Sequence, residues 1–466
     1  MADEDFRPHV LIVGAGIGGV ALAALLERAH IPYTIYERAP SVKFLGSAIA
    51  LGPGAMPFFD QLGVLDQILA RSKIIGPNFT WNEQLQLQSS LPFGVTKEEF
   101  GYEGVIIARP ALHSILLSQI PAEKISFNKR VLSHYETDDL VVIRTSDGKE
   151  HHGHILAGAD GAYSGVRQSL YEKLEKEHRL PKSDKDSLKG SVVCLVGQTQ
   201  PLDPANYPAL DERNTRFNTV IGEKGPYFWV TFTTADKTIC WMILMLLDQA
   251  TAKEHNGFRN SEWGPEAAES MAKQVRDFHI PCGDYKTIGN LIDLTPKELM
   301  SKVILEEKLF KTWYGGRTVL LGDACHKMTP NAGLGATTAI HDAIVLANYL
   351  STLKNNDTRS ITSLFQQYQD ERTPLAKDAV AASAAMAKLI GKTWYNLVYR
   401  KFLNNMPRWL WNILRQKQRC YRPQISFLPP ANDQGYRRPS YQRSLQVTRP
   451  KNLPIPSSAS ASASAL

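Results

Sequence analysis

The chain has 466 residues and a formal net charge of +7, with 43% hydrophobic and 21% charged residues. This length favours two or three domains, and the composition is typical of a globular protein with a sizeable core, which excludes a fibrous or disordered chain. Five scattered cysteines, none in a C-x-x-C pair, argue against a disulfide framework or a zinc site and fit a reducing compartment.

The N-terminal residues predict a strand, a glycine-rich turn and a helix. The opening MADEDFRPHV is acidic and lacks an apolar segment, so it is no secretory signal and we expect a cytoplasmic protein. Residues 9–13 form a β-rich run, Gly14, Gly16 and Gly19 follow as G-x-G-x-x-G, and a helical apolar pattern continues to about residue 30. Such glycines let the backbone approach a pyrophosphate, and the helix N-terminus offers it free N–H groups.

A second predicted strand, residues 33–36, ends at Glu37, eighteen residues after Gly19. An acid at this position accepts hydrogen bonds from ribose hydroxyls, which favours FAD or NAD over NADP as the bound dinucleotide. We assign Glu37 and the adjacent Arg38 to the cofactor site.

Two further motifs follow predicted strands. Residues 155–167 contain Gly-Ala-Asp-Gly around Asp160, and an ordinary hairpin turn is the alternative interpretation. Later, an apolar run ends in Gly322-Asp323, and Pro330 precedes a long apolar helical pattern over residues 331–350. A capped connection without a ligand is the alternative there.

Taken in this order, the three motifs resemble the fingerprints of class A flavoprotein monooxygenases, which have the para-hydroxybenzoate hydroxylase-like fold. Residues 323–331 and 426–429 are most similar to segments of fungal FAD-dependent monooxygenases and epoxidases of terpenoid and polyketide secondary metabolism. The resemblance covers residues 9–380 well and 420–440 weakly. It implies an α/β fold, with a Rossmann-like FAD-binding domain, an inserted β-sheet substrate domain and a C-terminal helical, basic extension.

The resemblance implies an enzyme that uses NAD(P)H and O2 to hydroxylate or epoxidise a small lipophilic substrate (terpenoid, polyketide or aromatic) through a flavin C4a-hydroperoxide. We expect NAD(P)H to bind transiently, because the chain has no second G-x-G-x-x-G between a strand and a helix. The alternatives are a flavin-dependent reductase or dehydrogenase and a non-catalytic flavin-binding protein. A flavin-dependent halogenase is disfavoured, because its Trp-x-Trp-x-Ile-Pro segment is absent.

Residue roles follow from the same resemblance. Asp323 is expected to bind the ribityl chain, Asp160 to serve FAD and NAD(P)H, and Arg109 to contact the FAD phosphates, although a surface arginine at a helix start is the alternative for Arg109. The small residues 46–50 match a loop that lies over the flavin. The predicted cofactor-binding residues are Gly14, Gly16, Gly19, Glu37, Arg38, Ala50, Arg109, Asp160, Asp323, Gly335 and Ala336. No metal site is expected.

The middle of the chain predicts a β-sheet that covers the active site, with strands over residues 191–196, 226–233 and 238–247. Tyr227 is our candidate catalytic residue, and Trp229 and Trp241 are candidates to line the pocket, with burial in an ordinary core as the alternative. Residues 192–194 lack the basic residue that steadies phenolate substrates in some relatives, which favours an alkene or a neutral substrate.

Two histidines and a lysine near the third motif, His326, Lys327 and His341, invite a catalytic role. We expect none of them to be catalytic, because the cofactor itself performs oxygen transfer in this family.

The C-terminal part differs from the rest in charge. Residues 391–451 contain thirteen Lys/Arg and one acid, a balance of +12, which leaves about −5 for residues 1–390. Residues 392–422 mix aromatic and basic side chains, and predict either peripheral membrane contact through an amphipathic helix pair or a pair packed on the FAD domain. Nucleic-acid binding is poorly supported, because no recognised reader motif is present.

We predict the following division. The FAD-binding domain comprises residues 1–75, 101–180 and 296–390, the substrate domain 76–100 and 181–295, the basic helical extension 391–451, and a disordered tail 452–466.

Overall fold

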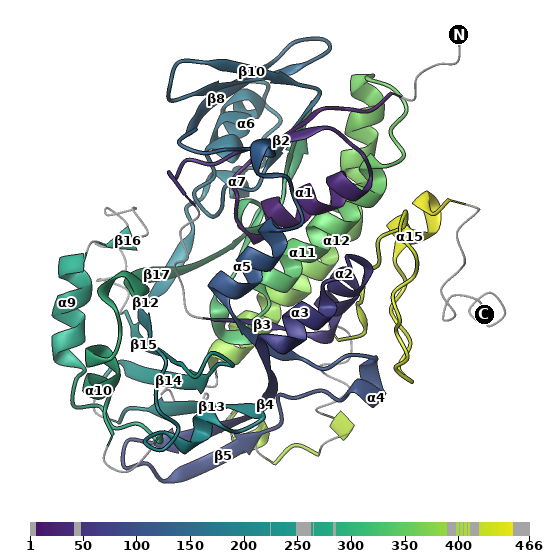
Figure 1. Ribbon diagram of the computed structural model, residues 1–466. Helices are drawn as coiled ribbons and strands as arrows, with labels where there is room; N and C mark the ends of the chain where they lie inside the picture. The colour runs from purple at the N-terminus through teal and green to yellow at the C-terminus, as the bar shows by residue number, and fades with distance from the viewer. Residues whose placement is uncertain are drawn as a thin grey trace.

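A computed structural model gives the structure of the chain (Figure 1). It describes residues 6–41, 48–223, 225–247, 262–263, 265–282, 286–388, 398–399, 401–403, 405–407, 409–410 and 419–450.

A six-stranded sheet carries all three motifs. Its order is β18 (Tyr314–Gly315), β19 (Thr318–Leu320), β11 (Ile155–Gly158), β1 (Val10–Val13), β2 (Tyr33–Tyr36) and β7 (Ile125–Ser126). Strands β19, β11, β1 and β2 run parallel, and they are buried on both faces, as parallel sheets usually are. Because neighbouring parallel strands end at one edge, the residues that follow β1, β11 and β19 meet there.

Helices cover this sheet. The principal ones are α1 (Ile17–Arg28), α5 (Arg109–Leu117), α6 (Gly165–Lys176), α11 (Gly335–Leu350) and α12 (Thr358–Lys388). Helices α1, α11 and α12 lie together in the centre of Figure 1. The first two approach closely at Gly18, where a Cβ atom would lie 3.4 Å from the Ala339 Cβ. Every α11 residue from Thr337 to Leu350 is buried, which explains its largely apolar sequence.

A second, larger sheet forms the other half of the molecule, at the lower left of Figure 1. Its order is β16 (Glu262–Trp263), β17 (Met300–Leu309), β12 (Lys189–Gln198), β15 (Ile239–Leu246), β14 (Tyr227–Thr233), β13 (Asn214–Ile221), β4 (Ser72–Asn82), β6 (Val105–Ala108) and β3 (Ala48–Leu51), with β5 (Leu87–Leu91) paired to β4 and β20 (His326–Lys327) to β17. Helices α9 (Pro265–Gln274) and α10 (Ile288–Asp293) cover one face and share a core with it. The predicted α/β class and the β-rich middle are confirmed.

Smaller elements complete the fold. A three-stranded sheet contains β8 (Val131–Glu136), β9 (Val141–Thr145) and β10 (Glu150–Gly153), and the short helices are α2 (Met56–Gln61), α3 (Leu65–Ala70), α4 (Lys97–Phe100), α7 (Lys182–Lys185) and α15 (Arg443–Thr448). Both sheets draw on distant parts of the chain, and the predicted domain boundaries stay a prediction.

The described end of the chain, residues 419–450, packs against helices α2 and α11. The Gln61 side chain of α2 donates to the Ile425 carbonyl at 3.0 Å and accepts from the Ile425 N–H at 2.8 Å. The Asn348 side chain of α11 donates to the Gln424 carbonyl at 3.0 Å. Much of this segment is irregular between residues 421 and 442, and tertiary contacts hold it. Helical residues occur in the described pieces 398–399, 401–403, 409–410 and 419–420 and in α15, as the expected helical extension requires, and most of residues 392–418 lie outside the described residues.

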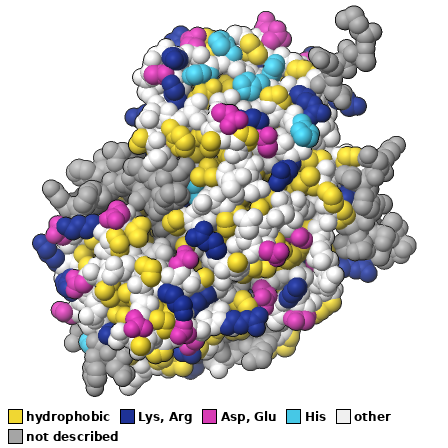
Figure 2. Space-filling model, in the orientation of Figure 1, with side chains coloured by type: hydrophobic (Ala, Val, Ile, Leu, Met, Phe, Trp, Pro, Cys, Tyr) yellow, Lys and Arg dark blue, Asp and Glu magenta, His cyan; other side chains and the backbone are white. Residues whose placement is uncertain are grey.

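The surface shows no concentration of one charge on the face drawn in Figure 2, where Lys/Arg and Asp/Glu side chains are interspersed. A nucleic-acid-binding face needs clustered positive charge, so this face does not suit one. Within the described chain, no helix has the length and apolarity needed to cross a membrane.

Candidate cofactor and substrate site

A cavity of about 780 Å³ lies where the three motifs face the larger sheet. Its volume is in the range of small-molecule and cofactor sites. Several residues predicted for the cofactor line it, namely Gly16, Ala50, Arg109, Asp323, Gly335 and Ala336. Residues 42–47 lie outside the description, so of the predicted loop 46–50 only its second part, in β3, is placed.

The first glycine turn is closed on one side and open on the other. Gly14 has φ +103°, and a Cβ there would lie 2.6 Å from the Ala159 oxygen. A Cβ at Gly19 would lie 2.1 Å from the Gly14 oxygen, so helix and strand require a glycine at this position. At Gly16, by contrast, a Cβ would meet no atom of the described residues within 4 Å, and this residue lines the cavity. The turn therefore presents bare backbone to a ligand.

Glu37 holds this turn in place. Its Oε2 accepts from the Ala15 N–H at 2.8 Å and its Oε1 from the Ala39 N–H at 2.9 Å. Neither Glu37 nor the exposed Arg38 lines the cavity as the structure has it. Their contact with a ribose stays a prediction.

The second motif is tied to the third. The Asp160 Oδ2 accepts from the Val166 N–H at 3.1 Å, whereas its buried Oδ1 has no partner among the described residues, and burial raises the pKa of Asp160. Arg167 donates through Nη2 to the Ala162 carbonyl at 2.7 Å and through Nη1 to the Ala324 carbonyl at 2.8 Å. Arg167 thus joins the two loops and does not reach the cavity.

Charged groups gather at the third motif. Lys327 Nζ donates to Asp323 Oδ2 at 2.6 Å, and both residues line the cavity with Arg109, the first residue of α5. Arg109 is exposed, and partial desolvation lowers its pKa while nearby Asp323 opposes this shift. Because Lys327 is paired with Asp323, Arg109 supplies the cation at this end that suits an anionic ligand such as a pyrophosphate.

The N-terminus of α11 opens on the same cavity. Its N-cap residue Leu334 makes no side-chain cap, and Gly333 before it has φ +64°. The Thr337 Oγ1 is buried and has no partner within the described chain. Free N–H groups and a free hydroxyl at a helix N-terminus favour a ligand that carries oxygen atoms or partial negative charge.

A buried ion cluster fixes the Gly322–Ala324 turn against α11. Asp342 accepts from the Gly322 N–H at 2.9 Å, from His326 Nε2 at 2.5 Å and from Arg372 Nε at 2.8 Å. Burial alone would raise the pKa of Asp342, but the charges of His326 and Arg372 lower it to about 2. Neither Asp342 nor Arg372 was predicted from the sequence, although an aspartate inside an apolar helical pattern was a signal for a buried polar contact.

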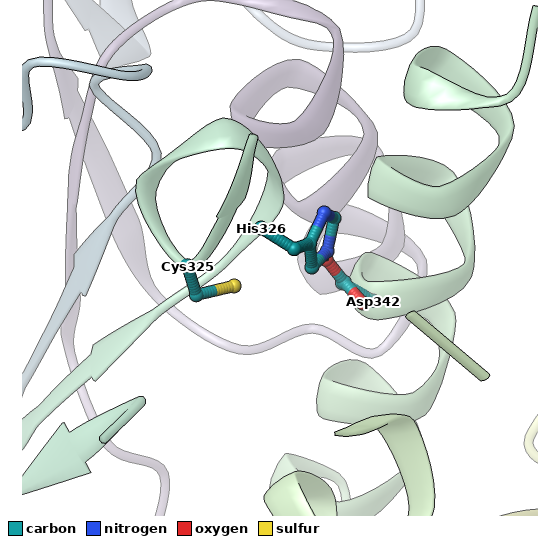
Figure 3. A group of neighbouring side chains, drawn as sticks. All are labelled: Cys325, His326 and Asp342. Atoms are coloured by element: carbon teal, nitrogen blue, oxygen red, sulfur yellow. The ribbon is translucent and has the colours of Figure 1, made fainter. Parts of the chain in front are cut away.

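Cys325 lies near this cluster, and Figure 3 shows His326 directed at Asp342. The potential ligand atoms of these three side chains lie within 4.8 Å of one another. The Arg372 guanidinium already occupies the carboxylate, however, and burial raises the pKa of the Cys325 thiol well above its usual value. A divalent cation is disfavoured beside a guanidinium and a protonated thiol, so the cluster fits a structural role.

Strand β14 presents alternate residues to the cavity. Phe228, Val230 and Phe232 line it. Tyr227 points to the opposite face, where its hydroxyl donates to Gln274 Oε1 at 3.2 Å, and Trp229 stacks there on an aromatic ring and donates to a main-chain oxygen. The placement of Tyr227 at the reacting centre is therefore corrected, because side chains alternate along a strand.

Trp241 is also in the core behind the sheet, where its Nε1 donates to Thr295 Oγ1 at 3.0 Å. His341, expected to be structural, bonds through Nε2 to the Gly54 carbonyl at 3.0 Å. The larger sheet contributes mainly apolar side chains to the cavity wall, with a few neutral polar ones. The apolar ones include Leu91, Phe93, Ile106, Phe217, Phe228, Val230, Phe232, Met242 and Leu244, and the polar ones are Asn78, Thr80, Ser89 and Thr219.

Comparisons with known proteins agree with this geometry. The family described as FAD binding domain matches residues 7–201 and 213–383. The FAD-dependent monooxygenase ptmM of Penicillium ochrochloron is 30% identical over 423 residues, covering 86% of this chain and 94% of the relative. The FAD-dependent monooxygenase paxM of Penicillium paxilli is 31% identical over 388 residues, covering 79% of this chain and 76% of the relative.

Solved structures share the fold. HpxO of Klebsiella pneumoniae, complexed with FAD and uric acid, superposes with a TM-score of 0.69 at 19% identity, covering 89% of this chain and 97% of that one. The tetracycline destructase Tet(51) superposes with a TM-score of 0.65 at 17% identity, covering 91% of this chain and 99% of that one.

Proposed function

The chain belongs to the FAD binding domain family and is an FAD-dependent monooxygenase, and on this premise we propose how its cavity divides between cofactor and substrate. The part lined by the three motifs holds FAD. The part lined by β4, β13, β14 and β15 holds a small lipophilic substrate. The observation that carries this division is a single cavity with bare backbone and charge at one end and an apolar wall at the other.

The residues present fit FAD. The exposed backbone at Gly16 suits the pyrophosphate, Arg109 supplies a cation for it, and Asp323 can accept from a ribityl hydroxyl. The uncapped N-terminus of α11, with the unpartnered Thr337 Oγ1, suits the electron-rich edge of the flavin. Bound FAD supplies the redox chemistry, accepting hydride from NAD(P)H and activating O2.

In the proposed reaction, the protein binds the substrate, orients it and keeps water away from it. The wall formed by Phe228, Val230 and Phe232 offers no group that titrates near neutral pH. Such a wall favours a lipophilic substrate and limits the access of water to the reacting atoms. No side chain of this wall is assigned as an acid or base, so its role is to position the substrate beside the cofactor that would supply the redox chemistry.

Transient binding of NAD(P)H forms part of this proposal. The one G-x-G-x-x-G turn is assigned to FAD, so the reductant lacks a dinucleotide cradle of its own and should leave after hydride transfer.

Peripheral membrane contact through the basic segment is a finer proposal. Among the described pieces of residues 398–410, Val398, Phe402 and Trp409 are exposed by 59%, 56% and 64%. Exposed apolar side chains beside basic ones suit an anionic lipid surface. Co-sedimentation with anionic and with neutral vesicles tests this proposal. A protein that binds neither kind of vesicle would contradict it.

The decisive experiment combines cofactor identification with labelled oxygen. The purified protein should be yellow, release FAD on heating and oxidise NAD(P)H faster when a lipophilic substrate is present. Mass spectrometry under ¹⁸O2 should show one labelled oxygen in the product. Release of FMN would contradict the FAD assignment. Product without label would indicate a dehydrogenase or reductase. A lack of NAD(P)H oxidation with every lipophilic compound tested would indicate a binding protein.

A further inference from the structure

Arg419 brings a guanidinium to the cavity from outside the region that matches the family. The match ends at residue 383, and Arg419 belongs to the C-terminal extension. Its side chain is 8% exposed and lines the cavity near Phe93. Its Nη2 donates to the Phe93 carbonyl at 3.3 Å, and in the part of the chain that the structure describes its guanidinium makes no other hydrogen bond. A guanidinium has five N–H donors, so most of its capacity is unused there.

The surrounding charges leave Arg419 without a counter-ion. Three guanidinium groups surround the ring of Phe100 at 5.8–6.0 Å from its centre, those of Arg419, Arg422 and Arg437. Asp433 pairs with Arg422 at 2.5 Å, and Glu99 pairs with Arg437 at 3.5 Å. Among the described residues no carboxylate forms an ion pair with Arg419. The cluster therefore has one uncompensated cation, and it is the one that lines the cavity.

Burial makes this arrangement costly. It lowers the pKa of Arg419 to about 10, with Glu99 opposing the shift and Arg437 adding to it. At neutral pH the group is still protonated, so a positive charge remains in a largely apolar wall. A buried charge without a partner is unfavourable, and an anion that enters the cavity relieves part of that cost.

We propose, on the premise that this cavity binds the substrate, that Arg419 recognises a carboxylate on an otherwise apolar substrate. The flat guanidinium matches a carboxylate in a two-point geometry, which no other side chain offers as well. The apolar body of the substrate lies against the wall formed by Phe228, Val230 and Phe232. This assignment departs from the neutral substrate that residues 192–194 favoured, because the cation comes from a distant part of the chain.

Binding to the oxidised, FAD-loaded enzyme tests this inference without turnover. Three pairs of probes share an apolar body and differ in charge, namely decanoic, geranic and 4-butylbenzoic acids and their methyl esters. Dissociation constants come from the change in flavin absorbance at pH 7.5. We expect at least one acid to bind about tenfold or more tightly than its ester, the size of effect that hydrogen bonds to charged groups produce.

Two variants and a matched control separate recognition from folding. Arg419→Gln should abolish the preference for acid over ester while ester affinity and FAD content stay within about twofold, and Arg419→Lys should keep part of the preference. Arg437 belongs to the same cluster, but it is paired with Glu99 and does not line the cavity. The Arg437→Gln variant should therefore keep the wild-type preference for acid over ester.

The inference is overturned if no acid binds more tightly than its ester, including the case in which no probe binds. It is also overturned if Arg419→Gln weakens acid and ester equally, since that result indicates a structural role, or if Arg437→Gln removes the preference as well. NAD(P)H oxidation and ¹⁸O incorporation are measured separately. If the acids bind more tightly than the esters but neither NAD(P)H oxidation nor ¹⁸O incorporation is seen, the role of Arg419 stands. The proposed monooxygenase reaction is then rejected for these probes.

Discussion

At the scale of single residues, the glycines of the first motif lack a side chain for two different reasons. At Gly14 and Gly19 a side chain would collide with main-chain oxygens at 2.6 and 2.1 Å, so these glycines are needed to build the turn. At Gly16 a Cβ would meet none of the described residues, so there the glycine suits the close approach of a ligand. Folding and binding therefore depend on separate positions only a few residues apart.

Gly16→Ala should leave the fold intact and weaken FAD. The new methyl group would meet no atom of the described residues, whereas against the proposed pyrophosphate such overpacking should cost about 1–3 kcal/mol. The thermal unfolding temperature of the FAD-free protein and the flavin-to-protein ratio measure the two effects. Gly19→Ala is the matched comparison and should yield little folded protein. Normal FAD affinity in Gly16→Ala would place the pyrophosphate elsewhere.

Asp323→Ala should lower FAD affinity by the value of a hydrogen bond to a charged group, about 1.5–3 kcal/mol. The measurement is the FAD dissociation constant of the reconstituted protein. Lys327→Met is the control, because it removes the 2.6 Å ion pair while keeping the carboxylate. If the lysine variant loses FAD as strongly as Asp323→Ala, the carboxylate acts through the ion pair rather than on the ribityl chain.

At the scale of elements, the parity of β14 decides which aromatic residues meet the substrate. Phe228 and Phe232 belong to the cavity face, whereas Tyr227 and Trp229 pack on Phe278 behind the sheet. A shift of one residue in register exchanges the two sets, because the side-chain period of a strand is two. Helix α11 also divides its residues between the cavity and the core. Its uncapped N-terminus meets the cavity, and the rest of the helix is buried in the core.

Val230→Phe should obstruct the substrate and spare the cofactor. The larger ring fills part of the cavity, and the expected rise in KM is about tenfold, within the cost of overpacking. Steady-state kinetics with the substrate found by screening, together with flavin content, measure the result. Tyr227→Phe, three positions earlier on the other face, should keep kcat and KM within about twofold. A large loss of kcat in that variant would restore Tyr227 as a catalytic candidate.

At the scale of the whole molecule, buried uncharged imidazoles link stability to pH. Burial lowers the pKa of His341 to about 3 and that of His134 to about 4. It also lowers the pKa of four further histidines, His9, His113, His151 and His154. In the unfolded chain these groups titrate near pH 6.5, so there they bind protons that the folded protein excludes.

The unfolding temperature should therefore be constant above about pH 7 and fall as the pH decreases through 6.5 toward 4. The unfolded state binds more protons in this window, and His341 and His134 each contribute a slope of up to about 1.4 kcal/mol per pH unit. Differential scanning fluorimetry from pH 8 to 4.5 measures the profile. His341→Gln keeps a donor for the Gly54 carbonyl and should flatten the slope by about one proton. A variant profile parallel to that of the wild type would contradict the burial of a neutral His341.

The order of strands, glycines and acids along the chain was enough to predict the three motifs and a bound FAD or NAD, and the resemblance that these motifs carry indicated FAD. The physical reason is local, because parallel strands end at one edge and a G-x-G-x-x-G turn is defined by its own backbone. The same applies to the β-rich middle, whose strands follow from branched and aromatic residues.

The tertiary structure alone decided which face of each strand meets the cavity and which distant residues complete the site. Tyr227 was misplaced because a strand's pattern does not say which of two buried faces is the pocket. The pairing of Asp342 with Arg372, and the arrival of Arg419 at the cavity wall, join positions far apart in the chain. Such contacts arise from packing between elements, and no local sequence pattern encodes them.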